Sequence, residues 1–284
     1  MKKIIFILPL YNDWKSANKI LKKINEIFSK QKAILKIIIV NDCSTEEIGT
    51  KIKKLSNIKT IKVLNLNKNL GSQKAIYIGL KKIEHETNSV VVIMDADGED
   101  DPSKLKKLIN KATQNTNRIV FAKRVKRTEN FILKFLNNIR LVLTFLLTGK
   151  YLNIGNFCAF SGNNLKKLLS NNNLIIAFSS GAVKNIKNNY YFGIEKKKRY
   201  FGSSKVNFYF LIIHSLNIIT VFYKEVFFRT SIIFLIILIV YETNYSLIFL
   251  LFYFLINSYF AFNYFLNIKK DLNLNVIKTI KKIN

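Results

Sequence analysis

Two carboxylates separated by one residue follow an apolar run and form the Asp-Ala-Asp sequence at residues 95–97. Asp95 and Asp97 can share a divalent cation such as Mg²⁺ or Mn²⁺, because carboxylate oxygens suit these ions. A cation held there can bridge a diphosphate and offset the charge that builds on a departing nucleotide. The acidic run continues through Glu99–Asp101, which either adds oxygen ligands or positions the loop. The structural alternative for the whole acidic stretch is a solvated turn that caps a helix beginning near Pro102.

A further carboxylate, Asp42, follows another apolar run and can accept hydrogen bonds from a base or a ribose. Ser44 or Thr45 is expected to cap the helix that comes next, with Glu47 as the capping-box partner of Ser44. Capping accounts for the hydroxyl groups and leaves the carboxylate unexplained. Asp42 is therefore a candidate for binding substrate.

A glycine-containing loop, Asn67–Lys74, follows a third apolar run. Gly71 permits a tight turn into the next helix. Lys74 stands where its ammonium group can meet a phosphate. Taken alone, the pattern is more typical of an ordinary loop that enters a helix.

The elements that must position these residues alternate between short apolar runs and longer helical patterns. Strands are expected at Ile4–Leu8, Lys36–Val40, Thr60–Leu64, Val90–Met94 and Ile119–Ala122, and helices at 14–29, 45–55, 72–85, 103–114 and 131–147. This alternation predicts a mostly parallel sheet with helices on both faces. Ligands of such sheets bind beyond the carboxyl ends of the strands, and the polar clusters at residues 12–13, 41–42 and 95–97 all fall there.

Composition narrows the classes of protein. The 284 residues suffice for one large domain and a smaller part, and 46 Lys and Arg against 17 Asp and Glu give a net charge of +29. Lysine is spread along the chain, which favours compositional bias or attraction to anionic lipid over nucleic-acid binding. Twelve of the 17 acidic residues lie at or before Asp101, so acidic chemistry is expected in that half. Cys43 and Cys158 have no metal-ligand spacing and fit a reducing compartment.

The last third of the chain is strongly apolar. Val206–Tyr223 lacks charge and carries a thin polar stripe, which predicts an interfacial amphipathic helix, with a core helix of the first domain as the alternative. Phe227–Tyr241 and Tyr245–Leu266 are expected to form a hairpin of two spanning helices. Both flanks of this region are basic, so the positive-inside rule places them in the cytoplasm.

Four motifs occur together in a familiar order and spacing: Pro9-Leu10-Tyr11-Asn12, Val40–Ser44, Asn69–Ala75 and Met94–Asp100. They resemble the family 2 inverting glycosyltransferases, close to the branch that transfers sugars to dolichyl or polyprenyl phosphate. The resemblance covers residues 1–205. It implies a GT-A-like α/β fold and a metal-dependent, inverting transfer of a hexose from a nucleoside-diphosphate sugar, with Mg²⁺ or Mn²⁺ as cofactor.

The resemblance also implies roles for individual residues. Substrate would be bound by Pro9, Tyr11, Asn12, Asp42, Lys74, Asp95, Arg199, Ser204 and Lys205. The metal ion would be held by Asp95, Asp97 and Glu99. The catalytic residues would be Asp97 and an arginine pair near the phosphates, Arg124 and Arg127. Arg199 and Lys205 belong to an Arg-x-x-Gly-x-Ser-Lys stretch whose cations would face a substrate phosphate or, alternatively, lipid headgroups.

The chain departs from the family pattern in three places. Asp13 replaces the more usual Glu, and Asn41 replaces the first of two Asp residues. Residues 155–158 read Gly-Asn-Phe-Cys, where many relatives carry an acid beside the glycine. A sugar hydroxyl needs a general base to attack, whereas a lipid phosphate is already anionic. The missing acid therefore favours polyprenyl phosphate as the acceptor.

The sequence thus predicts a multi-pass protein of the cytoplasmic membrane, with its catalytic domain facing the cytoplasm. The expected parts are a transferase domain at 1–205, an interfacial helix at 206–224, two transmembrane helices at 225–268 and a basic tail at 269–284. Its partners would be a UDP- or GDP-sugar, a lipid phosphate and the bilayer, with no nucleic acid and with a homo-oligomer left open. Two alternatives remain: transfer to a saccharide hydroxyl in cell-surface polysaccharide assembly, and an inactive nucleotide-sugar binding membrane protein. A nucleotidyltransferase would need a glycine-rich loop after the first strand, which Pro9–Trp14 is not.

Overall fold

The structure is a computed structural model, and it describes residues 2–46, 55–126, 131–202, 208–240, 246–269 and 274–283. These residues form one eight-stranded sheet in the order β7-β5-β6-β4-β1-β2-β3-β8. The strands are β1 Lys2–Leu10, β2 Ala33–Asn41, β3 Ile58–Leu66, β4 Val90–Ile93, β5 Ile119–Lys126, β6 Cys158–Ser161, β7 Tyr190–Glu195 and β8 Ile277–Lys282.

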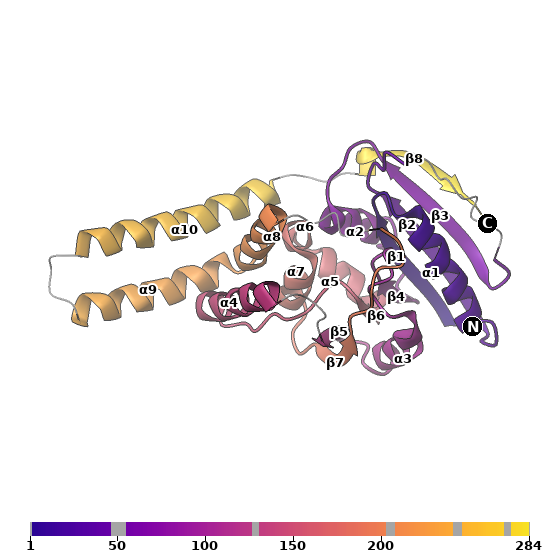
Figure 1. Cartoon of the computed structure of the whole chain (residues 1–284), viewed down its shortest axis with the longest axis horizontal. Coiled ribbons are helices and arrows are strands. Elements are labelled where there is room, and N and C mark those ends of the chain that lie inside the picture. The colour runs from indigo at the N-terminus through magenta and orange to yellow at the C-terminus, as the bar shows by residue number, and fades with distance from the viewer. Residues whose placement is uncertain are drawn as a thin grey trace.

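Helices cover the sheet and extend beyond it (Figure 1). They are α1 Trp14–Ile27, α2 Ser72–Lys81, α3 Leu105–Gln114, α4 Phe131–Thr148, α5 Leu165–Leu169, α6 Asn173–Ile176, α7 Phe178–Asn185, α8 Phe208–Thr220, α9 Tyr223–Val240 and α10 Ser246–Ile268. The helix expected at 45–55 falls mostly outside the described residues.

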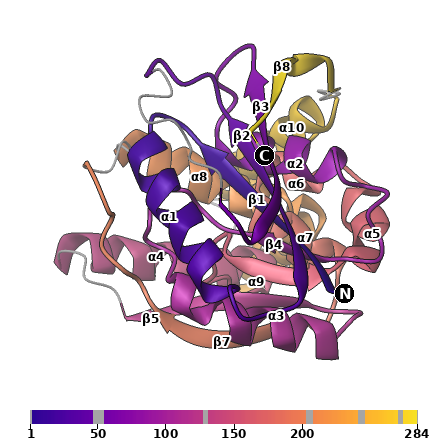
Figure 2. The ribbon, with the colours of Figure 1, turned by 90° about the vertical axis from the view of Figure 1, so that its right-hand side faces the viewer.

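The sheet is buried on both faces, which explains why its central strands are continuously apolar. Along β1, Ile4, Phe6 and Leu8 point into a core shared with α1 and α3. Ile5 and Ile7 alternate with them and point into a second core, shared with α2, α5 and α7. Figure 2 shows α1 and α3 on the side of the sheet that faces the viewer. The five predicted strands and the helices predicted at 14–29, 72–85, 103–114 and 131–147 are confirmed in kind, whereas the helix predicted at 45–55 is not tested.

The sheet is mostly parallel, as predicted, with an antiparallel insertion. β1 pairs in parallel with β2 and β4, and β2 pairs in parallel with β3. β6 lies antiparallel between β4 and β5, so these two strands are not neighbours in the sheet. β6 and β7 lie beyond the five strands predicted from the sequence.

The last three helices leave the sheet domain. The end of α8 is buried against the domain, whereas its first residues, Phe208–Ile212, are exposed. α9 and α10 run side by side away from the domain (Figure 1) and are joined by hydrogen bonds of Thr230 with Asn257 and of Ser231 with Tyr253.

Among the described residues, one helix is long and apolar enough to cross a membrane, at Leu247–Ile268 in α10. α9 has 18 residues and carries Lys224, Glu225 and Arg229 in its first two turns. Large exposed apolar side chains are frequent on the outer faces of α4, α8, α9 and α10. The expected two-helix hairpin is therefore present as a pair of packed helices, and its crossing of a bilayer remains a prediction.

The C-terminal residues differ from the expectation of a basic tail. β8 lies antiparallel to the edge strand β3, with Lys282 opposite Lys62 and Thr279 opposite Asn65. Thr279 accepts a hydrogen bond from the Asn65 amide at 2.9 Å. The lysines of this strand are exposed. A sequence so rich in lysine is typical of a solvated tail, which is why the strand was not predicted. The chain thus returns to the same sheet after α10.

Candidate active site

The three polar clusters predicted from the strand ends lie along one edge of the sheet. Leu10 pairs with Asn41 across β1 and β2, and the Asp42 N–H donates to the Leu10 carbonyl at 2.8 Å. On the other side of β1, the Met94 N–H donates to the Ile7 carbonyl at 3.2 Å. The residues that follow β1, β2 and β4 are therefore neighbours, because parallel strands end at the same edge.

Asp42 is held by the loop that enters α2. Its side chain is 3 % exposed, and its two oxygens accept the Leu70 and Gly71 N–H groups at 2.7 and 2.8 Å. Burial raises the pKa of Asp42, and these donors and the nearby charge of Lys74 oppose the rise without cancelling it. Gly71 adopts a positive φ of 85°, which a glycine tolerates at this turn. Asp42 therefore shapes the loop, and its contact with a nucleoside stays a prediction.

The loop after β1 is fastened to the loop after β2. Asn12 has a positive φ of 52°, and its backbone N–H donates to the Ser44 hydroxyl at 2.9 Å. Its side chain donates to Thr45 at 2.9 Å and accepts the Glu46 N–H at 3.0 Å. Both hydroxyl groups expected to cap a helix thus accept hydrogen bonds from Asn12, and the cap itself is not tested, because Glu47 and the residues after it lie outside the described residues.

The neighbouring nucleoside candidates differ in exposure. Pro9 is buried within β1, whereas the Tyr11 side chain is 37 % exposed at the end of that strand. Tyr11 is therefore the one of the two whose side chain solvent and a ligand can reach.

The Asp-Ala-Asp loop is shaped by its own acidic residues. The buried Asp100 accepts the Asp95 N–H at 3.0 Å, and Asp97 accepts the Glu99 N–H at 2.9 Å. Asp101 caps the short helical turn that begins at Pro102, by accepting the Ser103 N–H at 3.0 Å. Asp100 and Asp101 therefore position the loop, which was one of the two roles left open by the sequence.

A segment that follows β7 brings cations to this loop. The Arg199 guanidinium donates to Asp97 at 2.8 Å and to both oxygens of Asp13 at 2.8 and 2.7 Å. Lys196 pairs with Glu99 at 3.0 Å. Asp13 was expected in the polar cluster after the first strand but without a role of its own, and nothing local in the sequence links it to a residue 186 positions away.

The carboxylates of the Asp-Ala-Asp loop are suitable ligands for a divalent cation, but they do not by themselves form a complete coordination shell. Asp95 and Asp97 offer hard oxygen ligands at the carboxyl end of β4. Among the described residues, no three His, Cys, Asp or Glu side chains converge as a metal group, and Glu99 is engaged by Lys196. Asp95 and Asp97 would therefore hold the ion, and a place for Glu99 in its shell stays a prediction.

The remaining predicted residues are only partly placed. Arg124 lies in β5, where its backbone is opposite Ile194 of β7. Arg127, Ser204 and Lys205 lie outside the described residues. Lys74 lies in the first turn of α2 and lines a cavity of about 120 Å³ together with His214 and Asn217 of α8 and Asn267 of α10.

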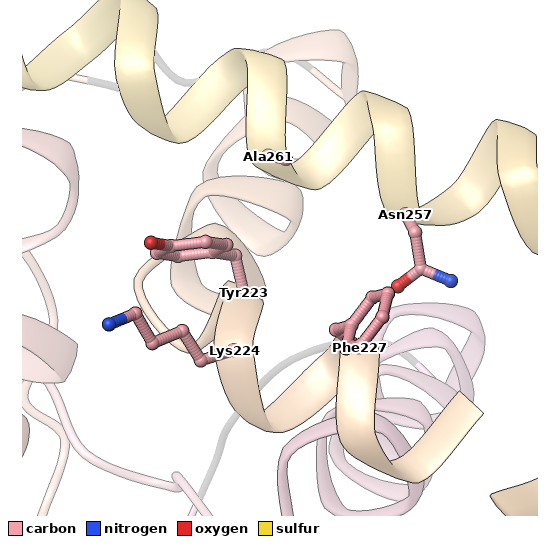
Figure 3. A pocket seen from close by; sticks show the side chains of 5 residues that line it. All are labelled: Tyr223, Lys224, Phe227, Asn257 and Ala261. Atoms are coloured by element: carbon pink, nitrogen blue, oxygen red, sulfur yellow. The ribbon is translucent and has the colours of Figure 1, made fainter. Parts of the chain in front are cut away.

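A second cavity, of about 360 Å³, lies between α9 and α10 and not at the strand ends. Figure 3 shows the residues that line it, Tyr223, Lys224 and Phe227 on α9 and Asn257 and Ala261 on α10, with the Phe227 ring beside Asn257. Its apolar walls carry none of the carboxylates that the Asp-Ala-Asp chemistry requires, so the candidate active site is the sheet edge.

Curated relatives share the first part of the chain. An uncharacterized glycosyltransferase of Synechocystis is 25% identical over 130 residues, which is 45% of this chain and 40% of the relative. The undecaprenyl-phosphate 4-deoxy-4-formamido-L-arabinose transferase of Salmonella choleraesuis is 24% identical over 153 residues, 53% of this chain and 45% of the relative. The chain thus spans less than half the length of these relatives.

Solved structures share the fold. Glucosyl-3-phosphoglycerate synthase from Mycobacterium tuberculosis, in complex with Mn²⁺, UDP-glucose and phosphoglyceric acid, superposes with a TM-score of 0.52 at 16% identity, covering 79% of this chain and 80% of that one. Mannosyl-3-phosphoglycerate synthase from Rubrobacter xylanophilus gives a TM-score of 0.53 at 14% identity, with 78% and 72% covered. These likenesses support the GT-A-like α/β fold.

The family model described as glycosyl transferase family 2 matches residues 5–170, which includes β1 to β6 and the Asp-Ala-Asp loop. The match covers more than half of the chain and agrees with the four motifs and with the fold. The protein belongs to glycosyl transferase family 2.

Proposed function

We propose that this glycosyltransferase moves a sugar from a nucleoside-diphosphate sugar to a lipid phosphate, most simply polyprenyl phosphate. The observation that carries the proposal is the cavity of about 120 Å³ that joins the two halves of the molecule. One wall is the first turn of α2, with Lys74, and the remaining walls belong to α6, α8 and α10. An anionic headgroup there would meet a cation and a helix N-terminus while its chain followed the apolar helices.

The return of the chain to the sheet supports membrane anchoring by a hairpin. β7 precedes α8 and β8 follows α10, and both strands belong to the same sheet. If the chain between these two strands crosses the membrane once, it must therefore cross it a second time in the opposite direction to return to the sheet. Because α10 has the length and composition of a span, α9 would be its partner, with the catalytic domain on the cytoplasmic side.

The proposed chemistry is an inverting displacement at the anomeric carbon. Mg²⁺ or Mn²⁺ bound by Asp95 and Asp97 would supply electrostatic stabilisation of the departing diphosphate. The chain orients these carboxylates through Asp100 and Glu99, whose contacts fix the loop. A phosphate acceptor is already ionised at neutral pH, so the absence of an acid at residues 155–158 is no obstacle.

The names of the relatives agree with this proposal. The Salmonella relative is named as a transferase of undecaprenyl phosphate, and the Mycobacterium structure holds Mn²⁺ and UDP-glucose. Transfer to a saccharide hydroxyl is the competing function, and it would require a base that the described site residues have not revealed.

A transfer assay on membranes tests the proposal. Membranes that contain the full chain are washed with alkaline carbonate, which strips proteins bound only at the surface. They then receive radiolabelled UDP- and GDP-sugars with either polyprenyl phosphate or a saccharide acceptor. Label in the lipid, dependent on Mg²⁺ or Mn²⁺, is the expected result. Label only in saccharide would overturn the lipid-phosphate acceptor, and loss of the protein in the wash would overturn the anchoring.

A further inference from the structure

The segment Lys196–Gly202, here called the strap, lies directly on the Asp-Ala-Asp loop. The Lys197 N–H donates to the Glu99 carbonyl at 2.9 Å, and the Tyr200 N–H donates to the Asp97 carbonyl at 3.0 Å. Gly98 has a positive φ of 92°, and a Cβ at this position would lie 2.6 Å from the Tyr200 ring. Only a glycine allows the strap to approach the loop this closely.

The strap is also held from the side of α1. The ammonium groups of Lys19 and Lys23 lie 4.5 and 5.0 Å from the centroid of the Tyr200 ring, in cation–π contact. Tyr200 is thus fixed between α1 and the Asp-Ala-Asp loop, which sets the position of the residue before it, Arg199.

Arg199 joins two carboxylates from different strand ends. One arm of its guanidinium donates to Asp97 and the other to Asp13, and all three side chains are 15–17% exposed. An arginine side chain keeps its proton in proteins at all ordinary pH values. The guanidinium is therefore a fixed positive charge at the candidate metal ligand.

This arrangement engages both oxygens of Asp97. One accepts the Glu99 N–H at 2.9 Å, and the other accepts the Arg199 arm at 2.8 Å. A divalent cation that approaches Asp97 alone meets a like charge at close range, which disfavours its binding. A nucleoside diphosphate brings negative charge that attracts both the ion and the guanidinium.

We propose that Arg199, positioned by Asp13, neutralises the charge of Asp97 while no metal ion is bound. When metal and nucleotide bind together, one arm of the Arg199 guanidinium leaves Asp97 and binds the donor diphosphate. Asp13 keeps its two contacts with Arg199 throughout, so the guanidinium turns about a fixed anchor. The inference rests on one part of the proposed function, the binding of a nucleoside-diphosphate donor, because the diphosphate is its trigger. It makes Asp13 a positioning residue and makes tight metal binding depend on the nucleotide.

Mn²⁺ binding to the full chain tests this without any turnover. Free Mn²⁺ is followed by electron paramagnetic resonance, with and without saturating UDP, for the wild type, Arg199→Gln and Arg199→Lys. Without UDP, Arg199→Gln should bind Mn²⁺ about tenfold more tightly than the wild type, because a like charge is removed. Arg199→Lys should fall between them, because one ammonium group cannot serve both carboxylates as the guanidinium fork does. UDP should tighten Mn²⁺ binding more in the wild type than in Arg199→Gln.

Lys197→Gln is the matched control. It removes a charge from the same strap, and its partner Asp101, at 3.8 Å, caps the turn at Pro102 and is outside the Asp95–Asp97 pair. Its affinity for Mn²⁺ should stay within about twofold of the wild type. Equal or weaker Mn²⁺ binding by Arg199→Gln, or an equal gain in Lys197→Gln, would overturn the inference. A protein that fails to transfer sugar but shows the expected Mn²⁺ order would refute the proposed function and leave this inference standing.

Discussion

The two edges of the central sheet both hold carboxylates beside cations, and they differ in where the cations come from. At the amino edge, Glu86 lies just before β4 and contacts Lys3 of β1 and Lys36 of β2. The two lysines belong to strands that the sheet already fixes as neighbours. At the carboxyl edge, Asp13 and Asp97 meet Arg199, which belongs to the strap.

This difference separates a structural ion pair from a site. In the Glu86 cluster, the charge of the carboxylate is balanced by lysines of neighbouring strands, so the cluster needs no further partner. The Arg199 cluster joins the ends of β1 and β4 to a segment from beyond β7, at the edge where parallel sheets bind ligands. The two clusters are therefore distinguished by the edge of the sheet at which each lies, and not by charge alone.

Asp97→Asn should break the carboxyl-edge cluster and produce the largest effect. The amide keeps an oxygen that can accept the Glu99 N–H, but it lacks the charge that the metal ion and Arg199 require. We expect sugar transfer to fall by roughly 100- to 1,000-fold, the size of effect seen when one electrostatic stabiliser of a transition state is removed.

Initial rates of lipid labelling with the wild type and Asp97→Asn provide the measurement, and thermal unfolding shows whether the variant is folded. A variant that unfolds at the temperature of the wild type and still transfers sugar at more than half its rate would contradict a role for Asp97.

Much of the carboxyl edge could be predicted from the sequence, because strand ends and loops are local features. The apolar runs located β1 to β5, and the rule for parallel strands brought Asp42 and Asp97 to the same edge. The Asp13–Arg199 contact could not be predicted, because it joins residues 186 positions apart. A carboxylate directly after the first strand is the only signal that pointed to Asp13.

The strands that escaped prediction are those whose pairing partners define them. β6 has four residues, which are too few to show a strand pattern in the sequence. Its place is set by the edges of β4 and β5, with which it pairs. β8 reads Ile-Lys-Thr-Ile-Lys-Lys, with its lysines exposed, and becomes a strand only beside β3. Tertiary contacts decide such segments more than local propensity does.

Asp42→Asn sharpens the comparison by testing a buried carboxylate of the carboxyl edge that pairs with backbone groups. The amide has one acceptor oxygen, so one of the Leu70 and Gly71 N–H groups would lose its partner and face an NH₂ group. We expect the free energy of unfolding to fall by about 1–3 kcal/mol, the cost of an unsatisfied buried donor. Denaturant unfolding measures the loss, and titration with UDP tests whether donor affinity falls as well. An unchanged free energy of unfolding would show that Asp42 does not support the loop.

Glu86→Gln tests the amino edge, where a small effect on stability and none on transfer are expected. Burial opposes the charge of Glu86, but the hydrogen bonds from Lys3 and Lys36 outweigh it and lower its pKa. Because the folded-state pKa lies below the ordinary value of about 4.3, the cluster stabilises the protein above that pH. This stabilisation is lost as the pH falls through the lowered folded-state pKa.

We therefore expect Glu86→Gln to cost about 0.5–1 kcal/mol at pH 7, and the difference from the wild type to shrink as the pH is lowered below about 4. Glu84→Gln is the matched control, because Glu84 pairs with Lys81, three residues earlier, at 2.9 Å and lies 3.3 Å from the exposed His85 ring, so it joins no two strands. Its cost should be smaller, about 0.3 kcal/mol, since such pairs gain little. Denaturant unfolding across this pH range and the transfer assay at pH 7 give both readouts. If Glu86→Gln slowed transfer and left the free energy of unfolding unchanged, the amino edge would not have the purely structural role that its ion pairs indicate.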